Sequence, residues 1–180
     1  MIKFITGNAN KFAEVNALMS GQVEQLVIDL PEIQDIDPHV IIRAKLQAAF
    51  EHASGQLMVE DVSLRMDCLN GLPGPLIKWF LKAMDPEGLA DKVAKLGNNR
   101  AEAFMVIGYA SNPGDIHFFE GSVAGTIVHP KVVSKFGWDG IFMPDGYDKT
   151  FAEMTAEQKN AISHRKIAVT KLVEFLKSSK

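Results

Sequence analysis

The first part of the chain alternates short apolar runs with segments of helical periodicity. The apolar run 2–6 predicts a buried strand that ends at a Gly-Asn pair, and apolar positions then recur every three or four residues over 12–19. A second strand is predicted over 23–30. The order strand, tight turn, helix, strand is typical of proteins that mix helices with a sheet.

The middle of the chain begins with a polar loop whose Asp37-Pro38 pair is typical of a helix start, with an aspartate N-cap and a proline at the first helical position. This helix should end near 54–55, before a third strand over 57–60. Glycines and prolines in 69–76 predict a rigid loop that leads into a short helix.

Another helix is predicted to start at Asp85-Pro86 and to end at Gly97. Two strands follow over 101–110 and 116–128, and the Ser-Asn-Pro-Gly turn between them predicts an antiparallel hairpin. Because this hairpin follows strand-helix units, we expect an α/β protein with a mixed sheet.

The last part of the chain combines a glycine-rich aromatic loop over 136–147 with a helical C-terminal region. Thr155 and Gln158 match a capping box, and the helical pattern that follows is expected to break near Ser163. No repeat or linker divides the sequence, so a single domain over residues 1–180 is expected.

Composition excludes several classes of protein. With 47% hydrophobic and 23% charged residues, the chain is an ordinary globular sequence, and its net charge of −3 does not suit a broad nucleic-acid surface. The single cysteine, Cys68, excludes an internal disulfide and suits a reducing compartment. Since no apolar run approaches the ~18 residues of a membrane span, we expect a cytoplasmic protein without membrane or nucleic-acid partners.

The turn Thr6-Gly7-Asn8 and the nearby Lys11 form the first candidate site. A turn between a strand and a helix presents backbone N–H groups and the positive end of the helix dipole, which favour an anion such as phosphate. The alternative is an ordinary turn in which Asn8 caps the helix, because a single glycine turn is weak evidence.

Three carboxylates, Glu32, Glu60 and Asp61, could together hold a hard divalent cation, with Mg²⁺ favoured over zinc. Taken separately, each is more often a solvated residue. Strand alternation sends Glu60 and Asp61 to opposite faces, so both can serve one metal only if the strand bends or bulges there.

Cations in apolar or amide-rich surroundings form a third group, with a solvated surface as the alternative. They are Lys45, Lys78, Lys159 and Arg165, the last two in a segment that also contains Ser163 and His164. Phe136, Trp138 and Asp139 offer aromatic rings beside a carboxylate, which suits a flat ligand, although core packing is the commoner role of such rings.

These stretches together resemble the inosine triphosphate pyrophosphatase family, enzymes that remove non-standard purine nucleoside triphosphates. The resemblance covers nearly the whole chain, and the sequence of the Leu-Pro-Gly-Pro motif is similar to that of eukaryotic-type members. The motifs are Thr6-Gly7-Asn8-x-x-Lys11, Val59-Glu60-Asp61, Leu69-Asn70-Gly71-Leu72-Pro73-Gly74-Pro75-x-x-Lys78-Trp79-Phe80, Glu120-Gly121 with Gly125, Phe136-Gly137-Trp138-Asp139, Phe151-Ala152-Glu153-Met154 and Lys159-Asn160-Ala161-x-Ser163-His164-Arg165.

The resemblance implies an elongated α/β fold with a mixed central sheet, two lobes with a cleft between them, and a homodimer. It implies hydrolysis of ITP, dITP and XTP to the monophosphate and pyrophosphate with Mg²⁺. The implied residue roles are these: Thr6, Asn8 and Lys11 hold the triphosphate; Glu32 and Asp61, with Glu60 nearby, handle Mg²⁺ and the attacking water; Lys45 and Lys78 neutralise phosphate charge; Phe136 stacks on the purine; and Trp138, Asp139, Lys159, Ser163, His164 and Arg165 surround base and phosphates.

Three positions depart from the family pattern. Val62 replaces a hydroxyl residue after the Glu-Asp pair, Gly140 replaces a proline, and the match of Lys45 requires one extra residue in the preceding loop. Val62 is therefore where activity is most expected to differ from relatives. Two alternatives stay open: a nucleotide pyrophosphatase of another substrate preference, and a nucleotide-binding protein without catalytic activity.

Overall fold

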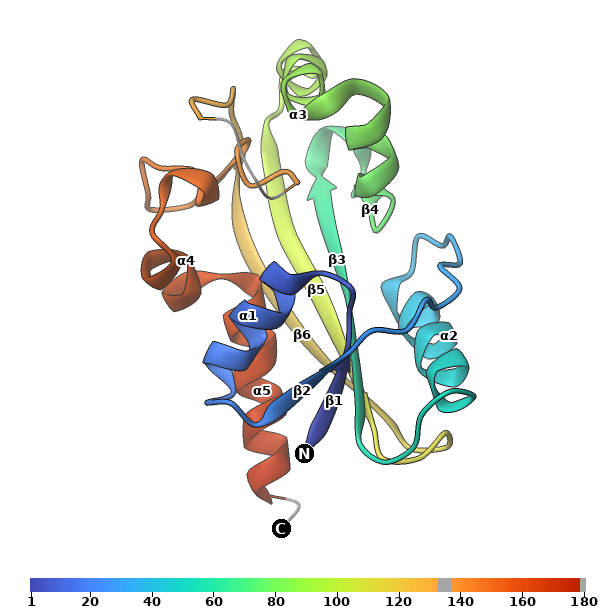
Figure 1. Ribbon diagram of the computed structural model, residues 1–180. Helices are drawn as coiled ribbons and strands as arrows, with labels where there is room; N and C mark the ends of the chain where they lie inside the picture. Colours follow the sequence, from blue (N-terminus) through green and yellow to red (C-terminus); the bar gives the residue numbers. More distant parts are fainter. Residues whose placement is uncertain (133–136, 179–180) are drawn as a thin grey trace. The chain divides into compact units, whose positions relative to one another are not determined.

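The computed structural model describes residues 1–132 and 137–178. The strands form one seven-stranded sheet of order β2-β1-β3-β5-β6-β7, with β4 paired to β3 (Figure 1). The elements are β1 (Ile2–Ile5), α1 (Ala9–Leu18), β2 (Val23–Leu26), α2 (Pro38–Phe50), β3 (Leu57–Met66), β4 (Pro73–Gly74), α3 (Ile77–Leu96), β5 (Arg100–Ala110), β6 (Ile116–Ile127), β7 (Phe142–Pro144), α4 (Ala156–Ile162) and α5 (His164–Ser178), with 3₁₀ turns at Asp67–Leu69 and Phe151–Glu153.

The sheet is mixed, as predicted. β1 pairs in parallel with β2 and β3, whereas β3 pairs with β4 and β6 pairs with β7 in antiparallel register. β5 and β6 are neighbours in the sheet and are joined by the short turn predicted between them. The predicted α/β class is confirmed, and the cleft between two lobes stays a prediction.

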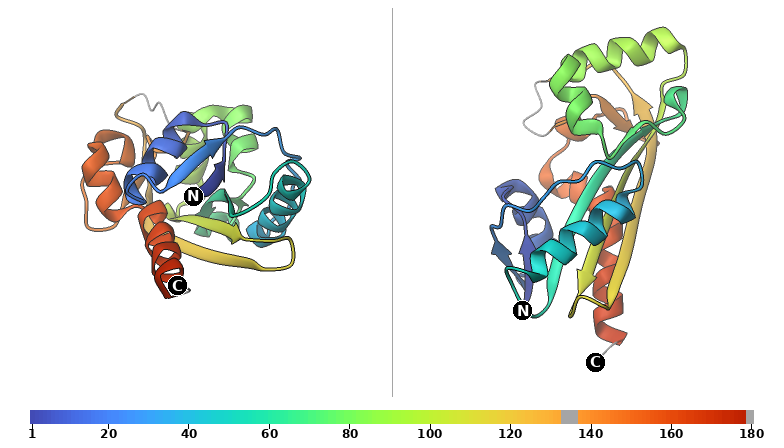
Figure 2. Two further views of the ribbon diagram at one scale, coloured as in Figure 1. Left: turned by 60° about the horizontal axis from the view of Figure 1, so that its bottom comes forward. Right: turned by 90° about the vertical axis from the view of Figure 1, so that its right-hand side faces the viewer.

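The chain divides into two compact units. Unit 1 comprises Met1–Asp61, Met105–Gly121 and His164–Lys180, and unit 2 comprises Val62–Phe104 and Ser122–Ser163. In unit 1, α1 and α5 lie on one side of the strands and α2 lies on the other (Figures 1 and 2). Strands of unit 1 therefore have apolar residues on both faces, which include Phe4, Leu57 and Met58 among the fully buried side chains.

The helices of unit 1 begin where their caps predict. Asn8 has an extended backbone, and its side-chain oxygen accepts hydrogen bonds from the N–H groups of Asn10 and Lys11. Asp37 caps α2 by accepting from the N–H of His39, and Pro38 occupies the first helical position. These caps place Lys11 in the first turn of α1 and Lys45 in the middle of α2.

α5 approaches β6 closely at Gly121. A Cβ atom at this position would overlap the carbonyl oxygen of His164, so only glycine lets the first turn of α5 lie directly on the strand. That turn includes Arg165. The close approach therefore decides where the Arg165 side chain enters unit 1.

Unit 2 is built around a cluster of apolar residues, in which side chains of α3 pack against side chains of the strands. The cluster includes Leu64 and Met66 of β3, Leu89 of α3, and the aromatic residues Phe142 and Phe151. α3 consists of two helical segments, because Asp85 has a non-helical backbone (φ 53°, ψ 176°) and precedes a proline. Both predicted helices are thus present, and the second ends at the left-handed Gly97 as expected.

Several predicted boundaries are wrong. β3 continues to Met66 and does not end at Glu60, since Leu64 and Met66 are buried apolar residues that extend the strand pattern. Charge at Glu60 and Asp61 suggested a strand end, but ion pairs make both carboxylates compatible with the strand interior. β2 ends at Leu26 and α2 at Phe50, both earlier than predicted, whereas the break at Ser163 is confirmed.

Candidate active site

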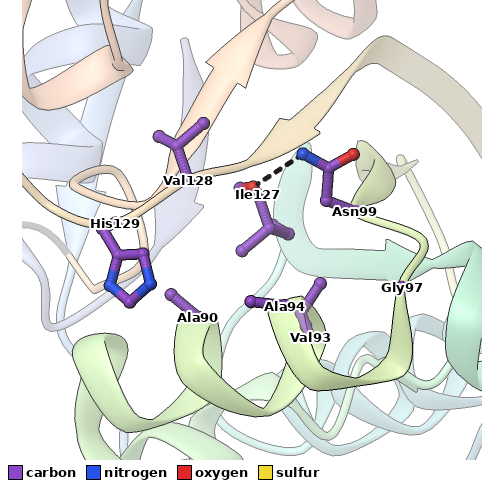
Figure 3. A pocket seen from close by; sticks show the side chains of 8 residues that line it. All are labelled: Ala90, Val93, Ala94, Gly97, Asn99, Ile127, Val128 and His129. Atoms are coloured by element: carbon purple, nitrogen blue, oxygen red, sulfur yellow. Dashed lines mark hydrogen bonds between the residues drawn. The ribbon is translucent and has the colours of Figure 1, made fainter.

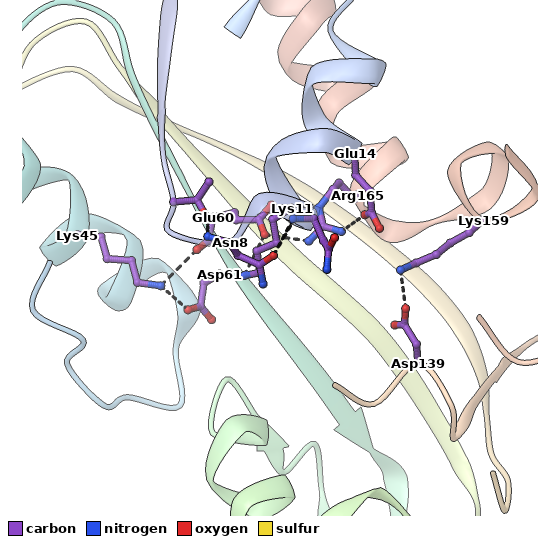
Figure 4. Close-up of polar contacts among 11 residues, drawn as sticks. Asn8, Lys11, Glu14, Lys45, Glu60, Asp61, Asp139, Lys159 and Arg165 are labelled. Carbon is purple, nitrogen blue, oxygen red and sulfur yellow. Dashed lines mark hydrogen bonds and ion pairs between the residues drawn. The ribbon is translucent and has the colours of Figure 1, made fainter. Parts of the chain in front are cut away.

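Glu60 lies at the centre of a buried cluster of charges in unit 1 (Figure 4). Its carboxylate accepts hydrogen bonds from Nε and Nη2 of Arg165, at 3.1 and 2.8 Å, and its Oε1 lies 3.0 Å from Nζ of Lys11. Glu14 of α1 pairs with Nη1 of the same guanidinium. Two carboxylates and two cations thus neutralise one another, and this pairing allows Glu60 and Arg165 to be buried as charged groups.

Asp61, the next residue of β3, pairs with a different helix. Nζ of Lys45 in α2 lies 2.9 Å from Oδ1 of Asp61 and donates a second hydrogen bond, of 3.2 Å, to the backbone carbonyl of Glu60. Consecutive residues of a strand point to opposite faces, so Glu60 meets α1 and α5 while Asp61 meets α2 (Figure 4). The irregular strand end expected at this pair is not found, because β3 runs on through both residues to Met66.

The two carboxylates ionise with opposite tendencies. Burial works against ionisation of Glu60, but the charges and hydrogen bonds of Arg165 and Lys11 outweigh it and hold the pKa of Glu60 well below its ordinary value. For Asp61, burial outweighs the attraction of Lys45 and raises the pKa. The surroundings of Glu60 thus favour its ionised form, whereas the positive charge near Asp61 does not fully offset the effect of burial.

Asp61 has the properties of a metal ligand. Its Oδ2 is buried and has no hydrogen-bond partner among the described residues. An unpartnered carboxylate oxygen is the type of donor that Mg²⁺ prefers. Glu32 is exposed in the segment between β2 and α2. Within residues 1–132 and 137–178, no three His, Cys, Asp or Glu side chains are grouped to hold a metal, so the predicted set of three carboxylates is not assembled.

The turn before α1 keeps its polar groups close to the backbone. Oγ1 of Thr6 accepts from the N–H of Asn8, and the Asn8 side chain caps α1. Both residues are partly or fully exposed, as is the Lys11 side chain at 28%. Asn8 thus caps α1, and the Lys11 side chain beside it is able to contact an anion from solvent.

A second predicted group lies in unit 2. Lys159 and Asp139 form a buried ion pair of 2.6 Å, and the Lys159 ammonium lies 5.8 Å from the centre of the Phe151 ring. Trp138 is buried and packs edge-to-face on Phe142 with ring centres 5.6 Å apart. Trp138 is therefore part of the apolar cluster of unit 2, and Lys159 and Asp139 are brought together as one polar site.

The remaining predicted residues are placed as follows. Lys78 is exposed in the first turn of α3, and its ammonium lies 5.8 Å from the ring of Trp79. Ser163 and His164 are buried at the junction of α4 and α5. Phe136 lies outside the described residues.

The sequence and the fold agree with those of known proteins over nearly the full chain. The profile of the Ham1 family matches residues 2–175. The chain belongs to the Ham1 family. The motif resemblance to pyrophosphatases of this kind is thereby confirmed at the level of the family.

Individual proteins are similar to this Ham1 family member in sequence or in structure. The inosine triphosphate pyrophosphatase of Schizosaccharomyces pombe is 42% identical over 182 residues, which cover 99% of this chain and 96% of that protein. The protein of that name from Saccharomyces cerevisiae is 42% identical, with 97% and 95% covered. The Ham1 protein of Staphylococcus aureus has the same fold, with a TM-score of 0.82 over the whole of both chains at 24% identity.

Arg165 was expected to contact base and phosphates, but in the structure its guanidinium pairs with carboxylates of the protein. All three guanidinium nitrogens are engaged by Glu60 and Glu14, and the residue is 2% exposed. Glu14 was missed in this Ham1 sequence. It lies three residues after Lys11 on α1, a spacing that indicates a pair within the helix and gives no sign of a distant arginine.

Unit 2 also contains a hollow of about 520 Å³ between α3 and the end of β6 (Figure 3). Its lining is mainly apolar, with Asn99 donating to the carbonyl of Ile127 and His129 at one side. No predicted site residue lines it, and it lacks the cations that a triphosphate requires.

In the part of the chain that the structure describes, no helix is both long and apolar enough to cross a bilayer.

Proposed function

We propose that this Ham1 protein hydrolyses non-canonical purine nucleoside triphosphates, namely ITP, dITP and XTP, to the monophosphate and pyrophosphate, with Mg²⁺ as cofactor. The observation that carries the proposal is Asp61, a buried carboxylate with one unpartnered oxygen, held beside the ammonium of Lys45. The names of the fungal relatives, which are 42% identical, support the same reaction.

The proposed roles follow the charges of the residues. Lys11, with Thr6 and Asn8, binds the triphosphate from the start of α1, and Lys45 and Lys78 neutralise further phosphate charge. Asp61 and Glu32 hold Mg²⁺ and orient the attacking water. Glu60 supports them indirectly because its carboxylate fixes Lys11. Phe136, Trp138, Asp139, Lys159, Ser163 and His164 are assigned to the base.

Hydrolysis of a phosphoric anhydride needs positioning and charge neutralisation more than covalent help, so no nucleophilic cysteine or serine is required. The ion pair of Glu60 with Arg165 holds the Lys11 ammonium in place before substrate arrives, which avoids the cost of ordering it later. When bound, Mg²⁺ supplies positive charge to the phosphate oxygens and to the developing leaving group.

Preference for hypoxanthine and xanthine over adenine follows from donors at the 6-position of the base. A 6-carbonyl accepts a hydrogen bond, whereas the 6-amino group of adenine leaves a buried donor unpaired, and such a mismatch discriminates strongly. Since Arg165 is committed to Glu60 and Glu14, His164 and Lys159 are the proposed donors.

The test is release of pyrophosphate from ITP, XTP, dITP, GTP, ATP and modified pyrimidine nucleoside triphosphates, measured with and without Mg²⁺ on the full chain. We expect the highest kcat/KM for ITP, XTP and dITP and no turnover without a divalent cation. Release of single phosphates would contradict the reaction. A ranking led by modified pyrimidine nucleotides would replace the substrate class, and ITP binding without any turnover would leave a nucleotide-binding protein.

We further propose that the protein forms a homodimer and is located in the cytoplasm. The resemblance described above supports the dimer, and the single Cys68 suits a reducing compartment. Sedimentation equilibrium of the purified chain and fractionation of cells that express it test the two statements separately.

A further inference from the structure

Lys45 forms an ion pair with Asp61, the carboxylate that is proposed to bind the metal. Its ammonium is anchored at two points, by Oδ1 of Asp61 at 2.9 Å and by the carbonyl of Glu60 at 3.2 Å. Both side chains are largely shielded, at 15% exposed for Lys45 and 13% for Asp61. The pair therefore forms in surroundings where charges act on each other more strongly than in water.

No other carboxylate on β3 is free to help a metal at this position. Glu60 points to the opposite face and is committed to Arg165 and Lys11. A divalent cation that arrives alone would meet one oxygen of Asp61 next to an ammonium group, and Mg²⁺ is usually held by several oxygens that include substrate phosphates. The repulsion between the two cations opposes its binding.

We infer that Lys45 holds Asp61 in the nucleotide-free protein and keeps a free divalent cation from binding, so that metal and triphosphate bind as one complex. On binding, the ammonium exchanges the carboxylate oxygen for a phosphate oxygen, and Asp61 becomes available to the metal. The inference rests on the proposed function. It makes Lys45 a residue that couples metal binding to nucleotide binding, in addition to neutralising phosphate charge.

The experiment measures binding of Mn²⁺, as a paramagnetic substitute for Mg²⁺, to the nucleotide-free full chain by electron paramagnetic resonance. Lys45→Met keeps the aliphatic length of the side chain and removes its charge. We expect this variant to bind Mn²⁺ at least about tenfold more tightly than the wild type, within the range of typical coupling effects. Asp61→Asn introduced into Lys45→Met should abolish the gain.

Lys11→Met is the matched control, because Lys11 pairs with Glu60 on the other face of the strand. Its effect on Mn²⁺ affinity should stay well below that of Lys45→Met. Equal gains from both variants, tight Mn²⁺ binding by the wild type, or no gain from Lys45→Met each overturn the inference. Lys45→Gln gives the same comparison if the methionine variant does not fold, with circular dichroism as the check.

A second measurement tests the coupling from the other side. Inorganic triphosphate, which lacks a base, should raise the Mn²⁺ affinity of the wild type strongly and that of Lys45→Met by at least about fivefold less. Equal enhancement in both proteins would contradict the exchange. Neither measurement depends on turnover, so failure of pyrophosphate release from ITP would contradict the proposed function and leave the role of Lys45 to be decided by Mn²⁺ binding.

Discussion

Arg165 donates from Nε and Nη2 to the two carboxylate oxygens of Glu60, at 3.1 and 2.8 Å, across 105 positions of the sequence. Both side chains are almost fully buried. The pair connects the first turn of α5 to β3, and Glu60 connects it further to Lys11 of α1. It therefore holds in place one of the cations proposed to bind the triphosphate.

Glu60→Gln should destabilise the protein by about 3–5 kcal/mol, because it leaves a buried guanidinium and an ammonium without their anion. Urea unfolding followed by circular dichroism measures the change. Asp145→Asn is the control, since Asp145 makes a similar two-point pair with Arg100 at an exposed position and should leave stability near that of the wild type. Equal losses in the two variants would contradict this account.

Asp61→Asn should lower kcat for ITP about a hundredfold or more, the size of effect expected for a group that orients the attacking water, while nucleotide binding persists. The unfolding midpoint at pH 7 should fall less than in Glu60→Gln, because burial already disfavours the ionised form of Asp61 and Lys45 keeps its hydrogen bond to the carbonyl of Glu60. The exposed Asp67 provides the control Asp67→Asn, which should retain wild-type turnover. A variant of Asp61 as active as the wild type would remove the residue from the mechanism.

The acidic limb of the pH profile should be set by Asp61. Burial raises the pKa of this carboxyl above its ordinary value of 3.8, so kcat/KM should begin to fall at a higher pH than for a solvent-exposed aspartate. Metal binding favours the ionised form, and saturating Mg²⁺ should move the limb to lower pH. Profiles at subsaturating and saturating Mg²⁺ check this, and a limb that Mg²⁺ does not move would contradict the assignment.

Stability should respond to the same two carboxylates with opposite signs. The contribution of Glu60, whose pKa is lowered, is complete above the ordinary value of 4.5 and is lost as the pH falls through the folded-state value. The contribution of Asp61, whose pKa is raised, is present below 3.8 and is lost as the pH rises through its folded-state value. In Asp61→Asn, the loss of stability on raising the pH should therefore be smaller, as urea unfolding at several pH values would measure.

Val62→Thr tests the departure from the family pattern. Val62 packs against the apolar cluster of unit 2, and alternation along β3 directs it away from Asp61. The new hydroxyl should cost about 1–3 kcal/mol of stability if it finds no partner, with kcat/KM for ITP changed by less than about threefold. A larger gain in activity would instead support the idea that this position limits turnover.

Local interactions allowed much of the fold to be predicted. Asn8, the Asp37-Pro38 pair, Gly97 and the Thr155–Gln158 capping box each mark a helix end, because caps act between residues a few positions apart. The third strand was wrongly predicted to end at Glu60, because the sequence near Glu60 does not show what neutralises its charge. The groups that neutralise its charge lie on α1 and α5, far away in sequence.

The sequence by itself determined the α/β class, the helix starts and the set of residue types that suit a nucleotide and a divalent cation. Only the tertiary structure decided which charges pair: Arg165 with Glu60 and Glu14, Lys45 with Asp61, and Lys159 with Asp139. The physical reason is that periodicity and capping depend on neighbours along the chain. Ion pairing inside a protein depends on distance and burial, which are settled when helices and strands from distant parts of the chain pack together.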